Sequence, residues 1–285
     1  QFHYSGCLDP SHGEKRPSSE GNFGMPVPTR CNWYAAGFMQ VLINGENAVA
    51  YRVSDMRVLD RGERGAVQAV WEAPDATVGL RLMMLPGANH VLALLQWQAR
   101  PDKTVKTVQV RLVAYPSFFT AARNRVGERH VLTPRIEERE GKTLTLDPAQ
   151  DTWLYLYDKV FDIARGEGEG PCAALVAPEG VAGGTVSIGG YAVVTLLNLK
   201  PEAGQARLGF YDFAGQTNAA AEEYLRTHGA RDVKELQTVD FRPLAVQRQA
   251  VAALRAEADQ LLAAAGDDGQ AQKPKFDALL AKLTT

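Results

Sequence analysis

The stretch Asp151–Cys172, DTWLYLYDKVFDIARGEGEGPC, contains the clearest strand pattern in the chain. In it Trp153, Tyr155 and Tyr157 alternate with two leucines, which is the two-residue period of a β-strand. One face of the predicted strand therefore carries three aromatic rings, and the other face carries leucine. We expect the strand to continue to Ile163 and to end in a loop of alternating glycine and glutamate.

Short predicted strands separated by turns lie on both sides of this stretch. Asn44-Gly45 indicates a hairpin because both residues tolerate positive φ, and we expect the return strand at Ala48–Val53. In Thr104–Tyr115 apolar and polar residues alternate, so one face of that strand is predicted to be buried. Turns recur at intervals of roughly 8–12 residues, which is typical of antiparallel sandwiches and barrels. The sequence thus predicts a mainly β fold, a large antiparallel β-sandwich over residues 37–215.

Both ends of the chain differ from this central region. Residues 1–36 are rich in Gly, Pro, Ser and charge, and they are predicted to form an irregular arm. Residues 216–285 are predicted to be helical and to pack on the sandwich or on a partner. A first helix is expected at Asn218–His228 with Gly229 as its stop, and a second at Leu244–Ala265 with an apolar stripe.

The composition argues against several classes of function. The chain has 285 residues and a formal net charge of −2, so it has no net basic field to hold nucleic acid or an anionic membrane. No apolar run approaches the ~20 residues of a membrane helix. Because the chain starts at Gln1 rather than Met, a removed export signal stays open, and a periplasmic or extracellular location is favoured.

The cysteines and histidines form no metal-binding pattern. Cys7, Cys31 and Cys172 fit no CxxC or zinc spacing, and the five histidines are scattered along the chain. We therefore predict no metal and no cofactor. In an oxidising compartment, a bridge between Cys7 and Cys31 would staple the N-terminal arm; three unrelated thiols are the equal alternative.

The aromatic face of the central strand is predicted to bind a sugar. Alternate residues on a strand stand ~6.5–7 Å apart, which is close to the width of a sugar ring. Flat rings suit the apolar C–H faces of pyranoses, and Tyr O–H and Trp N–H groups add hydrogen bonds. Trp153, Tyr155 and Tyr157 are therefore the predicted platform. The alternative is that these rings fill the space between two sheets.

A long predicted loop, Pro116–Arg129, supplies a second group of candidate ligand contacts. In a compact β-domain such a loop is either functional or a structural cover. Arg123, Arg125 and Arg129 belong to it, and guanidinium groups hold carboxylates such as that of a uronic acid. Solvated surface charges are the alternative interpretation.

His130, directly after this loop, is the candidate base of an enzymatic alternative. Histidine is a proton shuttle near neutral pH, and Asp158 or Glu169 would be its acid partner. Such a pair requires both groups to meet in one pocket. A histidine that merely satisfies its hydrogen bonds in a β-protein is the competing interpretation.

The strand layout over residues 37–213 resembles the large β-sandwiches ("supersandwiches") of the galactose-mutarotase-like group, over roughly two-thirds of the chain. Such sandwiches also occur as accessory domains of polysaccharide lyases and glycoside hydrolases. The resemblance is architectural, and it implies a carbohydrate-associated fold. Mutarotases use paired histidines and a glutamate base on the concave sheet, for which His90 and His130 are the candidates here.

The leading functional hypothesis from the sequence is a carbohydrate-recognising protein that acts alone or beside polysaccharide-processing enzymes. Its expected partner is an oligo- or polysaccharide, with no nucleic acid and no membrane span. A sugar epimerase, lyase or hydrolase on the same sheet face is the first alternative. The second alternative is a structural protein that self-associates through its C-terminal helices.

Overall fold

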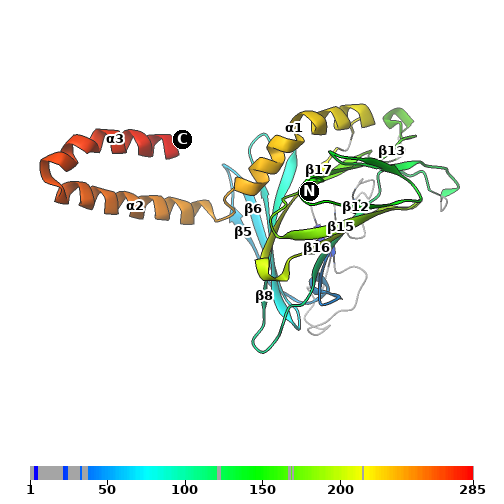
Figure 1. Ribbon diagram of the computed structural model, residues 1–285, viewed down its shortest axis with the longest axis horizontal. Helices are drawn as coiled ribbons and strands as arrows, with labels where there is room; N and C mark the ends of the chain where they lie inside the picture. Colours follow the sequence, from blue (N-terminus) through cyan, green and yellow to red (C-terminus); the bar gives the residue numbers. More distant parts are fainter. Residues whose placement is uncertain are drawn as a thin grey trace. The chain divides into compact units, whose positions relative to one another are not determined.

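The computed structural model describes residues 3–5, 22–24, 33, 38–120, 123–165, 168, 170–213 and 215–284. The described residues of its first unit, which spans residues 1–241, form two antiparallel sheets, one α-helix and short 3-10 helices. In Figure 1 the layers follow one another from the helix α1 (Asn218–Thr238), through one sheet, to the other. The predicted antiparallel β-sandwich is thus confirmed, with a helical third layer.

The smaller sheet has eight strands and contains the N-terminal end of the described chain. In spatial order it runs β1 (His3–Ser5), β2 (Asn22–Gly24), β3 (Met39–Ile43), β9 (Val108–Ala114), β16 (Val193–Leu199), β15 (Val181–Ile188) and β12 (Thr143–Leu146), with β4 (Glu46–Asn47) paired to β3.

The larger sheet has nine strands and holds the aromatic stretch at its middle. In spatial order it runs β11 (Glu137–Arg139), β10 (Arg129–Leu132), β13 (Trp153–Asp158), β14 (Cys172–Val176), β17 (Gln205–Asp212), β8 (His90–Ala99), β7 (Ala76–Met84), β6 (Gly65–Glu72) and β5 (Val53–Asp60).

The main hydrophobic core lies between the two sheets. Leu154 and Leu156 of β13 enter it beside Val110 and Leu112 of β9, and all four side chains are buried. Because successive side chains on a strand point to opposite faces, the three aromatic residues of β13 point to the other face of the nine-stranded sheet. We call that face, turned away from the eight-stranded sheet, the outer face.

A second core covers part of the outer face beneath α1. Trp153, Tyr155 and Tyr157 pack there with Leu225 and Leu236 of α1. All six residues of β13 are buried as a result, as expected of a strand covered on both faces. The aromatic rings therefore lie between a sheet and a helix, and not between two sheets.

The helix α1 runs nine residues beyond the predicted stop at Gly229, to Thr238. The prediction was wrong because this glycine serves packing rather than termination. A Cβ atom on Gly229 would lie 2.8 Å from Cδ1 of Trp153, so only glycine lets the helix approach the indole ring so closely. Arg207 of β17 marks the true end, because its Nη1 donates to three backbone carbonyls, the first that of Leu236 at 3.0 Å.

Polar contacts fix α1 to the sheet at two points. The Tyr155 hydroxyl donates to the backbone oxygen of Asn218 at 2.8 Å. Further along, the Tyr211 hydroxyl donates to the buried Asp232 carboxylate, which also accepts from Arg231 at 2.8 Å. Burying these polar groups is tolerated because each has a partner, so they specify how the helix docks.

In two places a 3-10 helix lies where the sequence predicted a strand. The strand β13 ends at Asp158 rather than Ile163, and a short 3-10 helix occupies Ile163–Arg165. After the confirmed hairpin turn at Asn44-Gly45, where both residues have positive φ, a 3-10 helix at Ala48–Ala50 interrupts the expected return strand.

The C-terminal residues 242–285 form the second unit. It contains α2 (Leu244–Ala264) and α3 (Gly266–Thr284), tied by ion pairs such as Lys273 with Asp259 at 2.5 Å. The predicted helical region thus divides, since α1 belongs to the unit of the sheets. Within the described residues, no helix is long and apolar enough to cross a membrane.

A buried histidine beneath α1 makes the stability of the first unit depend on pH. His90 is 4 % exposed and faces Tyr211, Asp232, Arg231 and Glu235, whose carboxylate lies 3.4 Å from Nε2. Burial lowers the pKa of His90 from its usual value of 6.5, against the opposing effect of the two carboxylates.

We predict that the free energy of unfolding falls as the pH drops below about 6.5, because the unfolded chain then binds a proton that the native His90 resists. Urea titrations at pH 7.5 and pH 5 should show a smaller loss for His90→Gln than for the parent protein. Equal losses in both proteins would refute this assignment.

Candidate functional site

The predicted aromatic platform is a packed interior. Trp153 is 6 % exposed, Tyr155 is fully buried and Tyr157 is 8 % exposed. The two tyrosine rings stack with their centroids 4.8 Å apart. Burial raises the pKa of both hydroxyls above the ordinary value of 10. A sugar could stack on Trp153 or Tyr155 only after α1 had left the sheet, so their role in binding stays a prediction.

His130 lies at the edge of this packed region, in a chain of hydrogen bonds. Its Nδ1 is 2.8 Å from Oε1 of Glu137 and its Nε2 is 2.8 Å from Oε1 of Glu128. The Tyr157 hydroxyl donates to the same Glu137 oxygen at 2.6 Å. These bonds lower the pKa of Glu137, the tyrosine bond first, and His130 lowers that of Glu128. Ionised carboxylates only accept hydrogen bonds, so each contact is a hydrogen bond when the facing imidazole nitrogen carries a proton.

Arg129 and Asp158 form a buried ion pair on the other face of the sheet. Both side chains are completely buried, with Nη1 of Arg129 3.1 Å from Oδ2 of Asp158. The same Nη1 donates to the Phe119 carbonyl at 2.6 Å, and Ser117 Oγ donates to Asp158 at 2.7 Å. A Cβ on Gly127 would lie 2.5 Å from Asp158 Oδ2. The pair therefore fastens the long loop to the sheet.

The structure does not bring His130 and Asp158 together. In the β10–β13 register Arg129 lies opposite Asp158 and His130 lies opposite Tyr157. Adjacent residues of a strand point to opposite faces, so the imidazole and the Asp158 carboxylate are separated by the sheet. Asp158 is not placed to serve as the acid partner of His130.

The remaining candidates lie in the loops. The exposed Arg123 places its guanidinium 4.3 Å from the centroid of the Phe118 ring, and Arg125 is also exposed. Glu169, the other candidate acid, lies outside the described residues, as do Cys7 and Cys31. The structure thus separates the arginines into one buried residue, Arg129, and two surface residues.

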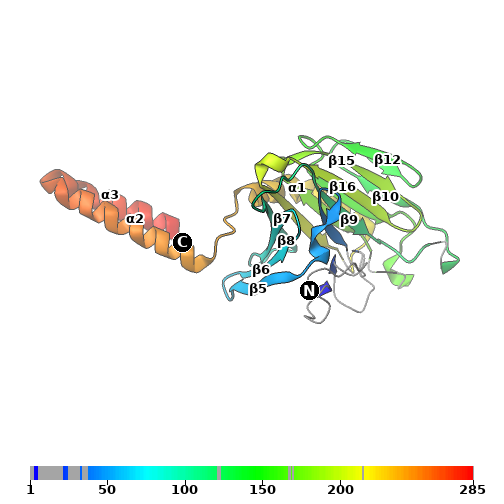
Figure 2. The same ribbon diagram turned by 90° about the horizontal axis from the view of Figure 1, so that it is seen from below.

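An open part of the outer face carries polar side chains instead of aromatic ones. It lies on β6, β7, β8 and β17, beyond the second core, and Figure 2 shows three of these strands, β6, β7 and β8, near one another. We call it the amide face. Its members are Gln68, Thr77, Gly79, Arg81, Gln96, Gln98, Gln205 and Arg207.

A hollow of about 310 Å³ lies over the centre of the amide face. Gly79 is opposite Gln96 in the β7–β8 register, and Thr77 is opposite Gln98. A Cβ on Gly79 would meet no atom within 4 Å, so the floor of the hollow is open. Glutamine amides beside this floor each offer a donor and an acceptor.

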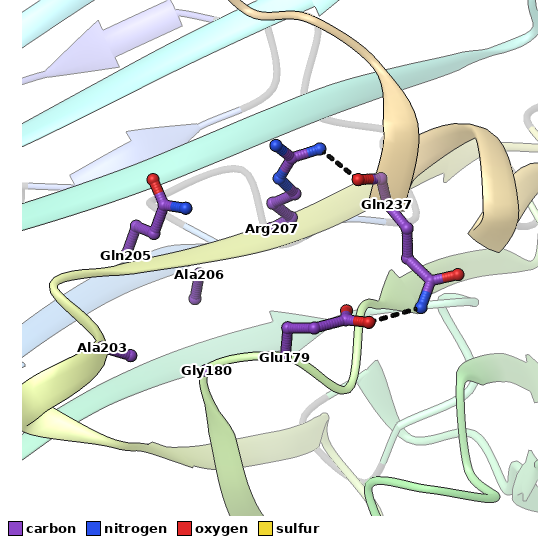
Figure 3. A pocket seen from close by; sticks show the side chains of 7 residues that line it. All are labelled: Glu179, Gly180, Ala203, Gln205, Ala206, Arg207 and Gln237. Carbon is purple, nitrogen blue, oxygen red and sulfur yellow. Dashed lines mark hydrogen bonds between the residues drawn. The ribbon is translucent and has the colours of Figure 1, made fainter.

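A second hollow, of about 280 Å³, adjoins the first through Gln205, which is opposite Gln96. Figure 3 shows Glu179, Gln237 and Arg207 around it. Gln237 Nε2 donates to Glu179 Oε1 at 2.8 Å. Gly180 has a φ of +82°, and a Cβ there would lie 2.4 Å from the Gln205 carbonyl oxygen, so glycine allows this turn to approach β17.

A third hollow, of about 360 Å³, has a different chemistry. Val58, Val67, Leu82 and Met84 contribute to its mostly apolar lining. It offers few groups that could orient sugar hydroxyls. The amide face is therefore the better candidate for a polar ligand.

The amide face was not predicted from the sequence, although the sequence contains a signal for it. In TVGLRL (77–82) and LQWQ (95–98) polar residues or glycine alternate with apolar ones, which places Gly79, Arg81, Gln96 and Gln98 on one side of their strands. Uncharged glutamines are ordinary on a wet sheet face, so alternation alone does not distinguish a binding surface. Strand pairing supplies the missing information.

Within the described part of the chain, no group of three or more His, Cys, Asp or Glu side chains is arranged to hold a metal ion. Cys172 is buried in the main hydrophobic core.

Comparison with known proteins identifies no family. No family model and no curated protein matches the chain. Among solved structures it is similar to the alpha-N-acetylgalactosaminidase NagBb from Bifidobacterium bifidum (14 % identity, 68 % of this chain, 33 % of that chain, TM-score 0.43). It is also similar to the alpha-galactosidase from Lactobacillus brevis (8 % identity, 67 % of this chain, 31 % of that chain, TM-score 0.42).

A third similar structure is the galactosidase domain of an alpha-galactosidase–sucrose kinase (12 % identity, 61 % of this chain, 27 % of that chain, TM-score 0.33). The chain thus spans about a third or less of the length of these carbohydrate-active enzymes. At these TM-scores the similarity does not define an activity.

We predict that Asp158 is needed for stability. Asp158→Ala should lower the free energy of unfolding by about 3–5 kcal/mol, because it leaves the buried Arg129 charge unpaired. Replacing both residues, as Arg129→Met with Asp158→Leu, should recover much of that loss. Urea unfolding measures both effects, with the half-exposed Asp162→Ala as control. A loss below about 1 kcal/mol for Asp158→Ala would contradict the structural role.

Proposed function

We propose that this protein recognises carbohydrate and that the amide face is its binding surface. The observation that carries the proposal is the pair of adjoining polar hollows on one open sheet face, floored by Gly79 and lined by glutamine and arginine side chains. Sugar hydroxyls both donate and accept hydrogen bonds, and glutamine amides can meet both needs at once.

The size of the hollows fits this ligand class. Their volumes, about 280 and 310 Å³, stand near the lower end of small-ligand sites, which suits sugar residues better than a large cofactor. Neighbouring strands are ~4.8 Å apart, so Gln96 and Gln205 present their amides to adjacent parts of one ligand. The continuous row favours an oligosaccharide over a single sugar.

The sheet supports these side chains rigidly. Gln68 accepts from Arg81 Nε at 2.7 Å, and its own amide donates to Asp55 at 3.2 Å. Arg207 is held by the carbonyls at the end of α1. Side chains held in place lose less conformational entropy when a ligand binds, so the packed helix and the open binding surface are linked through β17.

The sequence-predicted contacts contribute to this proposal in part. His130 and Tyr157 stay candidates for a separate sugar contact, because the carboxylates of Glu128 and Glu137 beside them are 40 % and 48 % exposed. None of the three hollows includes them. Arg123 and Arg125 stay predicted contacts at the surface of the long loop.

Filling the first hollow should abolish binding without unfolding the protein. In Gly79→Phe the new ring would enter open space above the strand, and phenylalanine is favoured in strands. We expect calorimetry with a panel of neutral and acidic oligosaccharides to show binding by the parent protein, and at least about a tenfold weaker affinity in the variant.

Thr143→Phe is the matched control, since it adds the same ring to an exposed position of β12 in the other sheet. It should leave the affinity unchanged. Failure of the parent protein to bind any glycan of the panel would refute carbohydrate recognition. Equal affinities of Gly79→Phe and the parent would place the binding surface elsewhere.

A further inference from the structure

Resting on the proposed function, we propose that the first hollow selects acidic sugars, with the Arg81 guanidinium binding the carboxylate of a uronic acid residue. Gln96, Gln98 and Thr77 line the same hollow and would contact the ring hydroxyls.

A hydrogen bond orients one side of the Arg81 guanidinium, and the other side is available to a ligand. Only Nε is engaged, by the amide oxygen of Gln68 at 2.7 Å, and among the described residues neither terminal nitrogen has a hydrogen-bond partner. Arg57, Asp55 and Gln68 continue this chain across β5 and β6. The guanidinium is therefore held by Gln68, and Arg81 is among the residues that line the hollow.

The charge of Arg81 is not neutralised by a neighbouring acid. Within the described residues, no carboxylate lies within ion-pair distance of it, whereas Asp55 is already paired with Arg57 at 3.1 Å. Arg207, in the adjoining hollow, also lacks a carboxylate partner there and instead contacts backbone carbonyls. In the first hollow, whose lining includes no acidic residue, Arg81 thus offers positive charge to an incoming anion.

A carboxylate is the anion that best fits this arrangement. Arginine binds a carboxylate through two parallel N–H···O bonds, which are stronger than neutral hydrogen bonds and fix its orientation. The surrounding amides carry no charge, so they suit the hydroxyls of the same sugar ring. A uronic acid combines both groups in one residue.

Calorimetry with an oligogalacturonide and with its carboxyl-reduced form tests the inference, because the two ligands share their ring hydroxyls and differ in carrying a carboxylate or a primary alcohol. The parent protein should bind the acidic form at least about tenfold more tightly, and added salt should reduce that difference. Arg81→Gln should weaken binding of the acidic form much more than binding of the reduced form, so that the preference falls below about twofold.

Arg111→Gln is the control, since it removes the same charge from β9 of the other sheet, and it should keep the full preference. Arg81→Lys should lose most of the preference, because it keeps the charge but not the fork. If the reduced form binds as well as the acidic one, or if Arg81→Gln keeps the preference, the acidic-sugar inference is overturned while carbohydrate recognition stands. If the parent binds neither form nor any glycan of the wider panel, both proposals fail.

Discussion

The packing of α1 on the outer face of the nine-stranded sheet is the constraint on which the rest of the structure depends. Gly229 allows the helix to meet the Trp153 ring, and the Tyr155 hydroxyl and the Asp232 carboxylate hold it at separate points. This contact buries the most apolar part of the sheet surface. The guanidinium of Arg207, at the edge of the open surface, donates to the last carbonyls of the helix.

The outer face is thus divided into a closed and an open part with opposite chemistries. Aromatic rings occupy the closed part, where burial is favourable and hydroxyl groups find partners. Amides and guanidinium groups occupy the open part, around the uncovered backbone of Gly79. The division explains why the strand with the most conspicuous sequence belongs to the core, while plain glutamines form the better candidate for a binding surface.

The sequence predicts the fold better than the site, for a physical reason. Period-two alternation correctly places Trp153, Tyr155 and Tyr157 on one face of a strand, but it does not tell what covers that face. Gly229 has the pattern of a helix end, and only the nearby indole ring shows its packing role. The pairing of Arg129 with Asp158, and of Gly79 with Gln96, depends on strand register between distant segments, which local patterns do not encode.

An NMR titration of the ¹⁵N-labelled protein with an oligogalacturonide and its carboxyl-reduced form tests the central claim most directly, that the amide face and not the aromatic strand meets the ligand. We predict that the resonances of the Gly79 backbone amide and of the Gln96 and Gln98 side-chain amides shift, while the indole N–H resonance of Trp153 stays unchanged. Shifts at Trp153 with none at Gly79 would contradict it, because the ligand would then displace α1 and occupy the aromatic strand.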